Sequence, residues 1–258
     1  MSANRSSAVM AQRAEAQDSL DDSPTPPWAT RALCAWIAET FAPGPFDVVR
    51  EPACNRGHMA RVLGEYFGRV EAADVMDYGA GYPVADYLFG PPPARVNWTI
   101  TNPPFRLAED FAHRALASSD NVALLLRSAF LEGEARYARL FSAAPPSDVL
   151  IFASRVVMWR GVLLDPDVAV WRATDHGGGK SEKPTTASSY AWFVWARAGE
   201  RAQRPGDAPT RLHWIAPGAR LRLTRPGDYP PVPAHLRAPA CPGDPFGPLF
   251  GGEVEKGG

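Results

Sequence analysis

The chain has 258 residues, 45% of them hydrophobic, which is enough apolar material for one core and favours a single domain of α/β size. Three scattered cysteines without metal-ligand spacing exclude a disulfide-rich secreted scaffold, and no signal-peptide core or membrane-spanning apolar run is present. The net charge of −1 argues against a uniformly basic nucleic-acid-binding protein. Residues 151–225, however, hold 12 Lys/Arg against 6 Asp/Glu, whereas the remainder holds 15 against 22. We therefore expect a cytoplasmic protein, without a metal, whose downstream half contacts a nucleic acid; arginine-rich composition alone would give a similar charge bias.

The chain begins with a polar, acidic stretch, residues 1–23, which we expect to be a mobile arm. Order should begin in the following residues, Ser23-Pro-Thr-Pro-Pro-Trp28. Apolar positions at 33, 36, 37 and 41 then predict an amphipathic helix with proline near its first turn. A short apolar strand is expected over residues 46–50.

The next segment, Glu51-Pro-Ala-Cys-Asn-Arg-Gly57, lies between this strand and a helical pattern, HMARVLGEYF. A strand, a glycine-containing turn and a helix form the unit that brings backbone amides close to a cofactor. Asn55 stands where a glycine is usual, and asparagine is the next best residue at positive φ.

Two acids follow at positions where a nucleoside cofactor is recognised. Residues 69–74 read as a second strand that ends in Asp74, about 20 residues past the turn, where a carboxylate can accept hydrogen bonds from ribose hydroxyls. Asp77 competes for this role, and either acid could be a solvated surface residue. A third, edge strand is weakly marked around residues 83–88, where Asp86 either caps a helix or meets an adenine amine.

The stretch Val96–Phe105, VNWTITNPPF, predicts a strand that Pro103 terminates, followed by a helix. Asn102, Pro103, Pro104 and Phe105 therefore form a rigid loop at the carboxyl end of a strand, where ligands bind in α/β sheets. The Asn102 side-chain oxygen and the Pro103 carbonyl can each accept a hydrogen of an exocyclic amine and so localise its lone pair for attack. Phe105 offers a flat face for a base. Because the chain contains 27 prolines, a simple turn remains an alternative.

Downstream, residues 121–126, 148–153 and 190–196 read as buried strands, and residues 131–141 as a helix. Strands alternating with helices predict a doubly wound, mostly parallel α/β sheet. Residues 154–189 are too long for a plain connection and carry aromatics, glycines and cations. Five of these cations are candidate nucleic-acid-binding residues: Arg155, Arg160, Arg172, Lys180 and Lys183. An ordinary surface insertion is the alternative. Residues 199–258 are rich in proline and glycine and predict an extended tail, with residues 212–215 docking on the body.

Together these residues resemble class I S-adenosylmethionine-dependent methyltransferases, and among them the DNA amino-methyltransferases, particularly phage or prophage adenine-N6 types with an NPPF motif. The resemblance covers residues 23–197 and implies a Rossmann-like, seven-stranded domain over residues 24–198 and S-adenosylmethionine as the cofactor. Its motifs imply a site assembled from five segments. The implied cofactor contacts are Thr25, Pro26, Trp28, Glu51, Ala53, Cys54, Gly57, His58, Asp74, Asp86 and Asn102. The catalytic motif is Asn102-Pro103-Pro104-Phe105.

The order of the motifs, cofactor before catalytic, resembles the gamma arrangement and leaves no room for a target-recognition domain of usual size. The same loop occurs in methyltransferases that act on guanine in ribosomal RNA and on a protein glutamine amide. These usually carry an additional N-terminal domain that is absent here. A third alternative is a non-catalytic nucleic-acid-binding module, of which Asn55 would be the sign.

Overall fold

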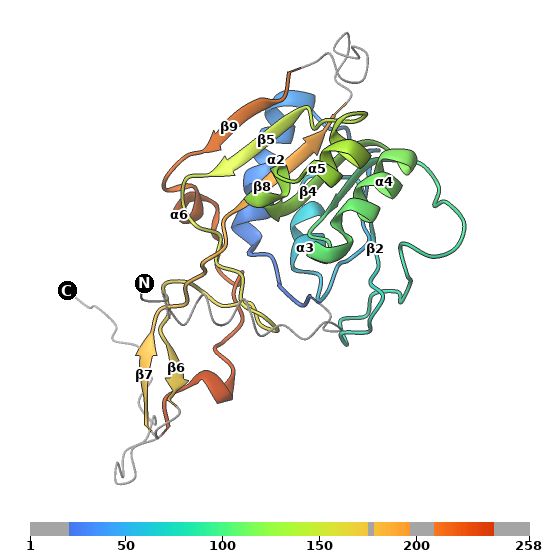
Figure 1. Cartoon of the computed structure of the whole chain (residues 1–258). Helices are drawn as coiled ribbons and strands as arrows, with labels where there is room; N and C mark the ends of the chain where they lie inside the picture. The colour runs from blue at the N-terminus through green and yellow to red at the C-terminus, as the bar shows by residue number, and fades with distance from the viewer. Residues whose placement is uncertain (1–20, 175–177, 197–208, 240–258) are drawn as a thin grey trace, which may run out of the picture.

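The computed structural model describes residues 21–174, 178–196 and 209–239, which form a seven-stranded sheet in the order β2-β1-β3-β4-β8-β5-β9 (Figure 1). All neighbours in this sheet are parallel except β8, which runs antiparallel to both β4 and β5. The strands are β1 (Val48–Glu51), β2 (Arg69–Ala72), β3 (Val96–Thr101), β4 (Ser119–Arg127), β5 (Asp148–Phe152), β8 (Tyr190–Trp195) and β9 (Arg211–Ile215). The predicted mostly parallel α/β sheet is confirmed.

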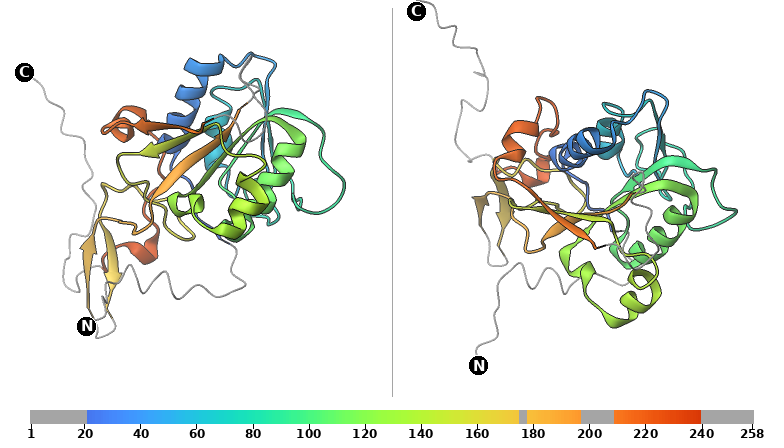
Figure 2. Two further views of the ribbon diagram at one scale, coloured as in Figure 1. Left: turned by 45° about the horizontal axis from the view of Figure 1, so that its top comes forward. Right: turned by 90° about the horizontal axis from the view of Figure 1, so that it is seen from above.

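Helices cover both faces of the sheet (Figure 2). One face packs against α2 (Pro27–Phe41), α3 (His58–Leu63) and α6 (Ala219–Leu223). The other packs against η1 (Phe105–Leu107), α4 (Ala108–Ser118), η2 (Ser128–Leu131), α5 (Glu134–Arg136) and η3 (Tyr137–Phe141). In β4 the buried residues alternate between these two layers: Ala123 and Leu125 face α2, whereas Leu124 and Leu126 face α4. A strand buried on both sides must be apolar throughout, which explains its continuous apolar run.

Helix α2 starts with Pro27 at its first position, where a missing N–H costs no hydrogen bond. Its predicted core positions Leu33 and Ile37 are fully buried. Arg31 was not expected to be buried, yet only 4% of it is exposed. Its guanidinium donates to both oxygens of Glu65 and to both oxygens of Asp228, so α2 is tied to the chain near its carboxyl end.

Two elements differ from the sequence prediction. No strand forms over residues 83–88; a single bridge between Asp74 and Val84 remains, because glycines with positive φ at 79, 81 and 90 and a run of prolines interrupt the extended backbone. The helix predicted over residues 131–141 is broken into η2, α5 and the π-turn η3, with Gly133 at φ 116° between the first two.

The seventh strand, β9, comes from the segment expected to be a tail. It pairs in parallel with β5 along its whole length, and the buried carboxylate of Asp148 accepts hydrogen bonds from Arg211 and pairs with His213, both on β9. The predicted docking of residues 212–215 is thus confirmed as strand pairing. The expected domain boundary at residue 198 lies inside the sheet-forming part of the chain.

The insertion after β5 contains a two-stranded hairpin, β6 (Val170–Ala173) and β7 (Gly179–Glu182), which projects from the body in Figure 1 beside η5 (Ala234–Leu236). The residues before it are well packed, with Val156, Leu163 and Leu164 buried. In the described part of the chain, no helix is both long and apolar enough to cross a membrane.

Candidate active site

A cavity of about 320 Å³ opens at the carboxyl ends of β1 and β3. This is the edge of an α/β sheet at which ligands bind, and the volume lies at the lower end of the range for small-molecule sites. Four predicted segments line it together with residues 21–25. The lining comprises Asp21, Ser23, Pro24, Thr25, Glu51, Pro52, Ala53, Cys54, Asn55, His58, Met59, Asp74, Val75, Tyr78, Asp86, Tyr87, Leu88, Asn102, Pro104, Leu107 and Phe111.

The turn after β1 has the backbone that a glycine-rich cofactor loop requires. Asn55 adopts φ 50° and Gly57 adopts φ 74°, both in the left-handed region. Tyr82 lies so close to Gly57 that an added Cβ would meet its hydroxyl oxygen at 2.1 Å. Asn55 therefore adopts the left-handed conformation that glycine usually provides, and Gly57, an expected cofactor contact, does not line the cavity.

Glu51 lines the cavity although only 2% of it is exposed. Burial, aided by the negative charge of Asp74, raises its pKa well above the usual value. Its Oε2 is buried without a hydrogen-bond partner among the described residues. A buried acceptor without a donor is costly, so Glu51 is suited to receive a ligand that brings a positive charge or a donor.

Asp74 lies in the cavity, whereas Asp77 is exposed and does not line it. One Asp74 oxygen accepts the Asn55 backbone N–H at 2.7 Å, and the other accepts the Met76 N–H at 3.1 Å. Each carboxylate oxygen retains a lone pair for a hydroxyl donor. Asp86 also lines the cavity, and its carboxylate accepts the Leu88 N–H within a turn; no helix begins there, so the expected helix cap is not formed.

Two further side chains of the turn have shifted pKa values. Burial, together with the charges of Arg61 and Arg56, lowers the pKa of His58 to about 4, so its imidazole is neutral at pH 7. Burial raises the pKa of Cys54 to about 12, with help from Glu51 and Asp74. The Cys54 thiol is therefore a packing group rather than a nucleophile.

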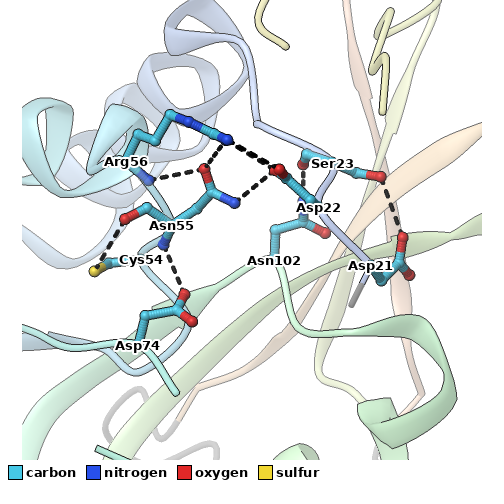
Figure 3. A network of polar contacts seen from close by, with 8 residues as sticks. All are labelled: Asp21, Asp22, Ser23, Cys54, Asn55, Arg56, Asp74 and Asn102. Atoms are coloured by element: carbon cyan, nitrogen blue, oxygen red, sulfur yellow. Dashed lines mark hydrogen bonds and ion pairs between the residues drawn. The ribbon is translucent and has the colours of Figure 1, made fainter. Parts of the chain in front are cut away.

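Asn102 follows the last residue of β3, and its side chain points toward residues 21–23 (Figure 3). Its Nδ2 donates to the Ser23 carbonyl at 2.9 Å and contacts Met158 Sδ at 3.6 Å. Its Oδ1 is buried and has no hydrogen-bond partner among the described residues. The predicted acceptor is thus left open, while the donor half of the amide is fully used.

Of the remaining NPPF residues, Pro104 lines the cavity, whereas Pro103 and Phe105 do not. The Phe105 ring has the Arg127 guanidinium at 4.7 Å from its centroid and the Tyr190 ring at 5.7 Å with an interplanar angle of 30°. The face expected to stack on a base is therefore occupied by side chains in this structure.

Residues Asp21, Asp22 and Ser23, here called the strap, were not predicted as part of the site. Asp22 pairs with Arg56 at 3.0 Å, and an Asp21 carboxylate oxygen accepts the Phe105 N–H at 3.0 Å. Thr25 lines the cavity next to the strap. Pro26 and Trp28 do not line it: Pro26 precedes α2, and Trp28 packs edge-on against Phe152 in the core. The expected arm thus ends in ordered residues, and residues 1–20 lie outside the described part.

The basic insertion reaches the site through its first residues. Met158 contacts Asn102, and Gly161 donates its N–H to the Asp22 carbonyl at 2.7 Å. The Arg172 guanidinium stacks on Trp159 at 4.7 Å. Arg155 instead donates to the carbonyls of residues 186 and 187 at the base of the insertion.

The two predicted lysines of the hairpin pair with acids. Lys180 pairs with Glu182, and Lys183 lies 3.5 Å from Asp167. Arg160 is exposed, one residue past Trp159. Arg160 and Arg172 are therefore the predicted cations that adjoin or contact Trp159, the residue after Met158. No group of His, Cys, Asp or Glu side chains suitable for a metal ion occurs among residues 21–174, 178–196 and 209–239.

No protein-family model and no curated protein matches the sequence. Among solved structures, one from Listeria monocytogenes, described as a class I S-adenosylmethionine-dependent methyltransferase, superposes with a TM-score of 0.52 at 9% identity over 80% of this chain and 69% of that chain. A described RNA methyltransferase from Pyrococcus horikoshii gives a TM-score of 0.47 at 16% identity, over 74% of this chain and 96% of that one. A type I restriction-modification methyltransferase subunit from Streptococcus thermophilus gives 0.47 at 10% identity, over 71% and 46%. The chain therefore has the fold of class I S-adenosylmethionine-dependent methyltransferases.

Proposed function

We propose that the protein transfers the methyl group of S-adenosylmethionine to an exocyclic amine, N6 of adenine in DNA. The observation that carries this proposal is the Asn102 amide at the end of β3, whose Oδ1 is buried without a partner beside a cavity lined by acids. When bound, S-adenosylmethionine would supply an electrophilic methyl group on a sulfonium.

The residues of the cavity fit this cofactor. The partnerless Oε2 of Glu51 suits the ammonium group of the methionine part, and pairing with a cation would favour the ionised carboxylate. Asp74 can accept from the ribose hydroxyls, as in other nucleoside-binding α/β folds. Leu107 and Phe111 supply apolar walls for an adenine ring near Asp86.

The catalytic loop acts by position and charge placement. Asn102 Oδ1 and the Pro103 carbonyl each accept a hydrogen of the target amine, which localises its lone pair toward the methyl group. Pro103 and Pro104 hold both acceptors in place at low entropic cost. The His58 imidazole is neutral at pH 7 and therefore adds no positive charge to the cavity.

DNA as the substrate is supported by the basic insertion next to the catalytic loop. Trp159 and Arg160 directly follow Met158, which touches Asn102, and the Arg172 guanidinium stacks on Trp159. Cations interleaved with aromatic rings are typical of surfaces that bind single-stranded or extruded bases. The positive φ of Asn55 supports an enzyme over a non-catalytic module, since the cofactor turn keeps its shape.

The substitution Asn102→Ala tests the proposal. We expect kcat to fall about 10²- to 10³-fold, the scale for loss of one preorganised polar contact to a transition state. The protein is incubated with labelled S-adenosylmethionine and, separately, unmodified duplex DNA, single-stranded DNA and RNA, and the methylated nucleoside is identified after digestion. N6-methyladenine in DNA is the expected product. Label found only in RNA guanine or in protein, or near-wild-type turnover of Asn102→Ala, would refute the assignment.

A further inference from the structure

Three segments that are distant in sequence meet at the strap, residues 21–23. One is the cofactor turn at residues 55–56, the second is the catalytic loop at residues 102–105, and the third is the start of the insertion at residues 158–161. The strap is thus the shared contact between the part of the site that would hold the cofactor and the part that would hold the target amine (Figure 3).

The contact between Ser23 and Asn102 decides which atom of the Asn102 amide is left as the acceptor. The Ser23 carbonyl can only accept, so it requires the Nδ2 donor at 2.9 Å. Turning the amide by half a turn would set Oδ1 against the Ser23 oxygen and would put the NH2 group where an acceptor is needed. The Ser23 carbonyl therefore selects the orientation of Asn102 that can receive an amine.

The strap is held in place from the cofactor turn. Asp22 Oδ1 accepts from Asn55 Nδ2 at 2.7 Å, and both Asp22 oxygens accept from Arg56 at 3.0–3.1 Å. Asn55 Oδ1 in turn accepts the Arg56 backbone N–H at 2.8 Å and its guanidinium at 2.9 Å. A glycine at position 55 could adopt φ 50° but would offer none of these contacts. The side chain of Asn55 thus has a specific partner, Asp22, in addition to its backbone role.

We propose that the strap is a positioning element for Asn102: anchored by Asn55 and Arg56, it fixes the Asn102 amide with Oδ1 available to the target amine, and so links the cofactor turn to turnover. Asp22 does not line the cavity, so it acts through Ser23 and Asn102 rather than on a ligand. This inference rests on the proposed function for its kinetic consequence. Its structural part, the link between Asp22 and the catalytic loop, does not depend on activity.

Two variants remove the hydrogen bond between Asp22 and Asn55, one from each side. Asp22→Ala removes the carboxylate, and Asn55→Gly removes the amide while keeping a residue suited to positive φ. We expect kcat at saturating substrate to fall about 10- to 100-fold in each, because a misoriented acceptor loses most of its value in the transition state. The double variant should be no slower than the slower single variant, since both changes break one link. Asp22→Asn, which retains an acceptor for Asn55, should recover part of the loss.

The binding of S-adenosylhomocysteine separates positioning from cofactor binding. Its Kd, measured by calorimetry, should change less than about threefold in Asp22→Ala. Asp120→Ala, which breaks the exposed Arg95–Asp120 pair at the opposite end of the sheet, is the matched control and should leave kcat unchanged. A kcat within twofold of wild type in both anchor variants, or a loss of affinity as large as the loss of turnover, would overturn the inference.

Hydrogen exchange reports the same link without catalysis. The Phe105 N–H donates to Asp21, and residues 103 and 104 are prolines without an N–H, so a peptide spanning 102–107 reports on few amides. In Asp22→Ala this Phe105 amide should exchange about tenfold faster than in wild type. Unchanged exchange overturns the inference even if the wild-type protein methylates nothing. If the wild-type protein is inactive but the Phe105 amide still exchanges faster in Asp22→Ala, only the proposed function is refuted.

Discussion

Residues 21–31 take part in two ion-pair clusters, each of which joins an arginine guanidinium to carboxylates. The two arginines differ in how far they are buried. Arg31 is buried with Asp228 and Glu65, whose side chains are 7% and 26% exposed, whereas Arg56 and Asp22 are 37% and 17% exposed. The first cluster ties α2 to α3 and to the chain near residue 228; the second ties the strap to the cofactor turn. Removing one partner of the buried cluster would leave an uncompensated charge in the interior, whereas removing one partner of the more exposed cluster should cost little stability.

The largest expected effect comes from the buried cluster. Asp228→Ala should lower the free energy of unfolding by about 3 kcal/mol, because it leaves the charge of Arg31 only partly compensated in the interior. Hydrogen bonds to Glu65 and Asp228 raise the pKa of Arg31, although burial opposes them. Arg31 therefore stays charged in the variant and cannot relieve the cost of burial by losing its proton. Urea unfolding measures the change. Asp22→Ala, in the rim cluster, should cost at most about 1 kcal/mol. Equal losses in the two variants would break the comparison.

Glu51 sharpens the comparison because it is a buried carboxylate that forms no ion pair with the described residues, although the charge of Arg61 acts on it from a distance. Its raised pKa means that the folded protein loses stability as the pH rises above the unfolded value of 4.5, where the unfolded chain releases its proton first. Glu51→Gln should therefore raise the free energy of unfolding at pH 8 more than at pH 5. The same variant should weaken S-adenosylhomocysteine binding about 10- to 100-fold, through loss of a charged hydrogen bond.

Calorimetry of wild-type protein in buffers of different ionisation enthalpy provides an independent check on Glu51. Binding of the ammonium group should release a proton from this carboxyl at any pH between 4.5 and the raised pKa of the folded protein, and binding should tighten as the pH rises through that range. Unchanged affinity in Glu51→Gln, together with no proton release, would contradict a role for Glu51 at the cofactor.

The smallest effect is expected at Asp148, a buried carboxylate paired with two half-exposed groups on β9. Burial alone would raise its pKa, but hydrogen bonds from Arg211 and His213 outweigh burial and lower the pKa. The stabilising contribution is therefore present above the unfolded value of 3.8 and is lost as the pH falls through the lower folded value. Asp148→Asn should cost about 1 kcal/mol near pH 7, and this difference should shrink below pH 4 in urea titrations. A constant difference down to pH 3 would show that the charge is irrelevant.

The elements that the sequence predicted correctly have local signals. The apolar runs of β4, β5 and β8 and the apolar periodicity of α2 depend on neighbours a few residues away, and proline marks the end of β3. The cavity also joins Glu51, Asp74, Asp86 and Asn102, because parallel strands bring their carboxyl ends to one edge.

The elements that were missed depend on distant partners. Arg211–Ile215 alternates weakly in polarity and becomes a strand by pairing with β5, where Asp148, 63 residues before Arg211, accepts hydrogen bonds from that arginine. The strap is acidic and reads as solvated, since its partners Asn55 and Asn102 lie 33 and 79 residues away. The one sign of the strap's contacts in the sequence was Asn55, which stands where a glycine is usual. The prediction of an edge strand over residues 83–88 was wrong because turns at the neighbouring glycines compete with extended backbone.

The pairing of β9 with β5 bears on how the protein can be shortened. A version ending at residue 198, where proline and glycine begin to dominate the sequence, would keep every residue of the cavity yet remove Arg211 and His213 from Asp148 and expose the backbone edge of β5. Such a truncated protein would be prone to aggregate through that open edge. The segment that reads as a dispensable tail is thus needed to cover the edge of β5.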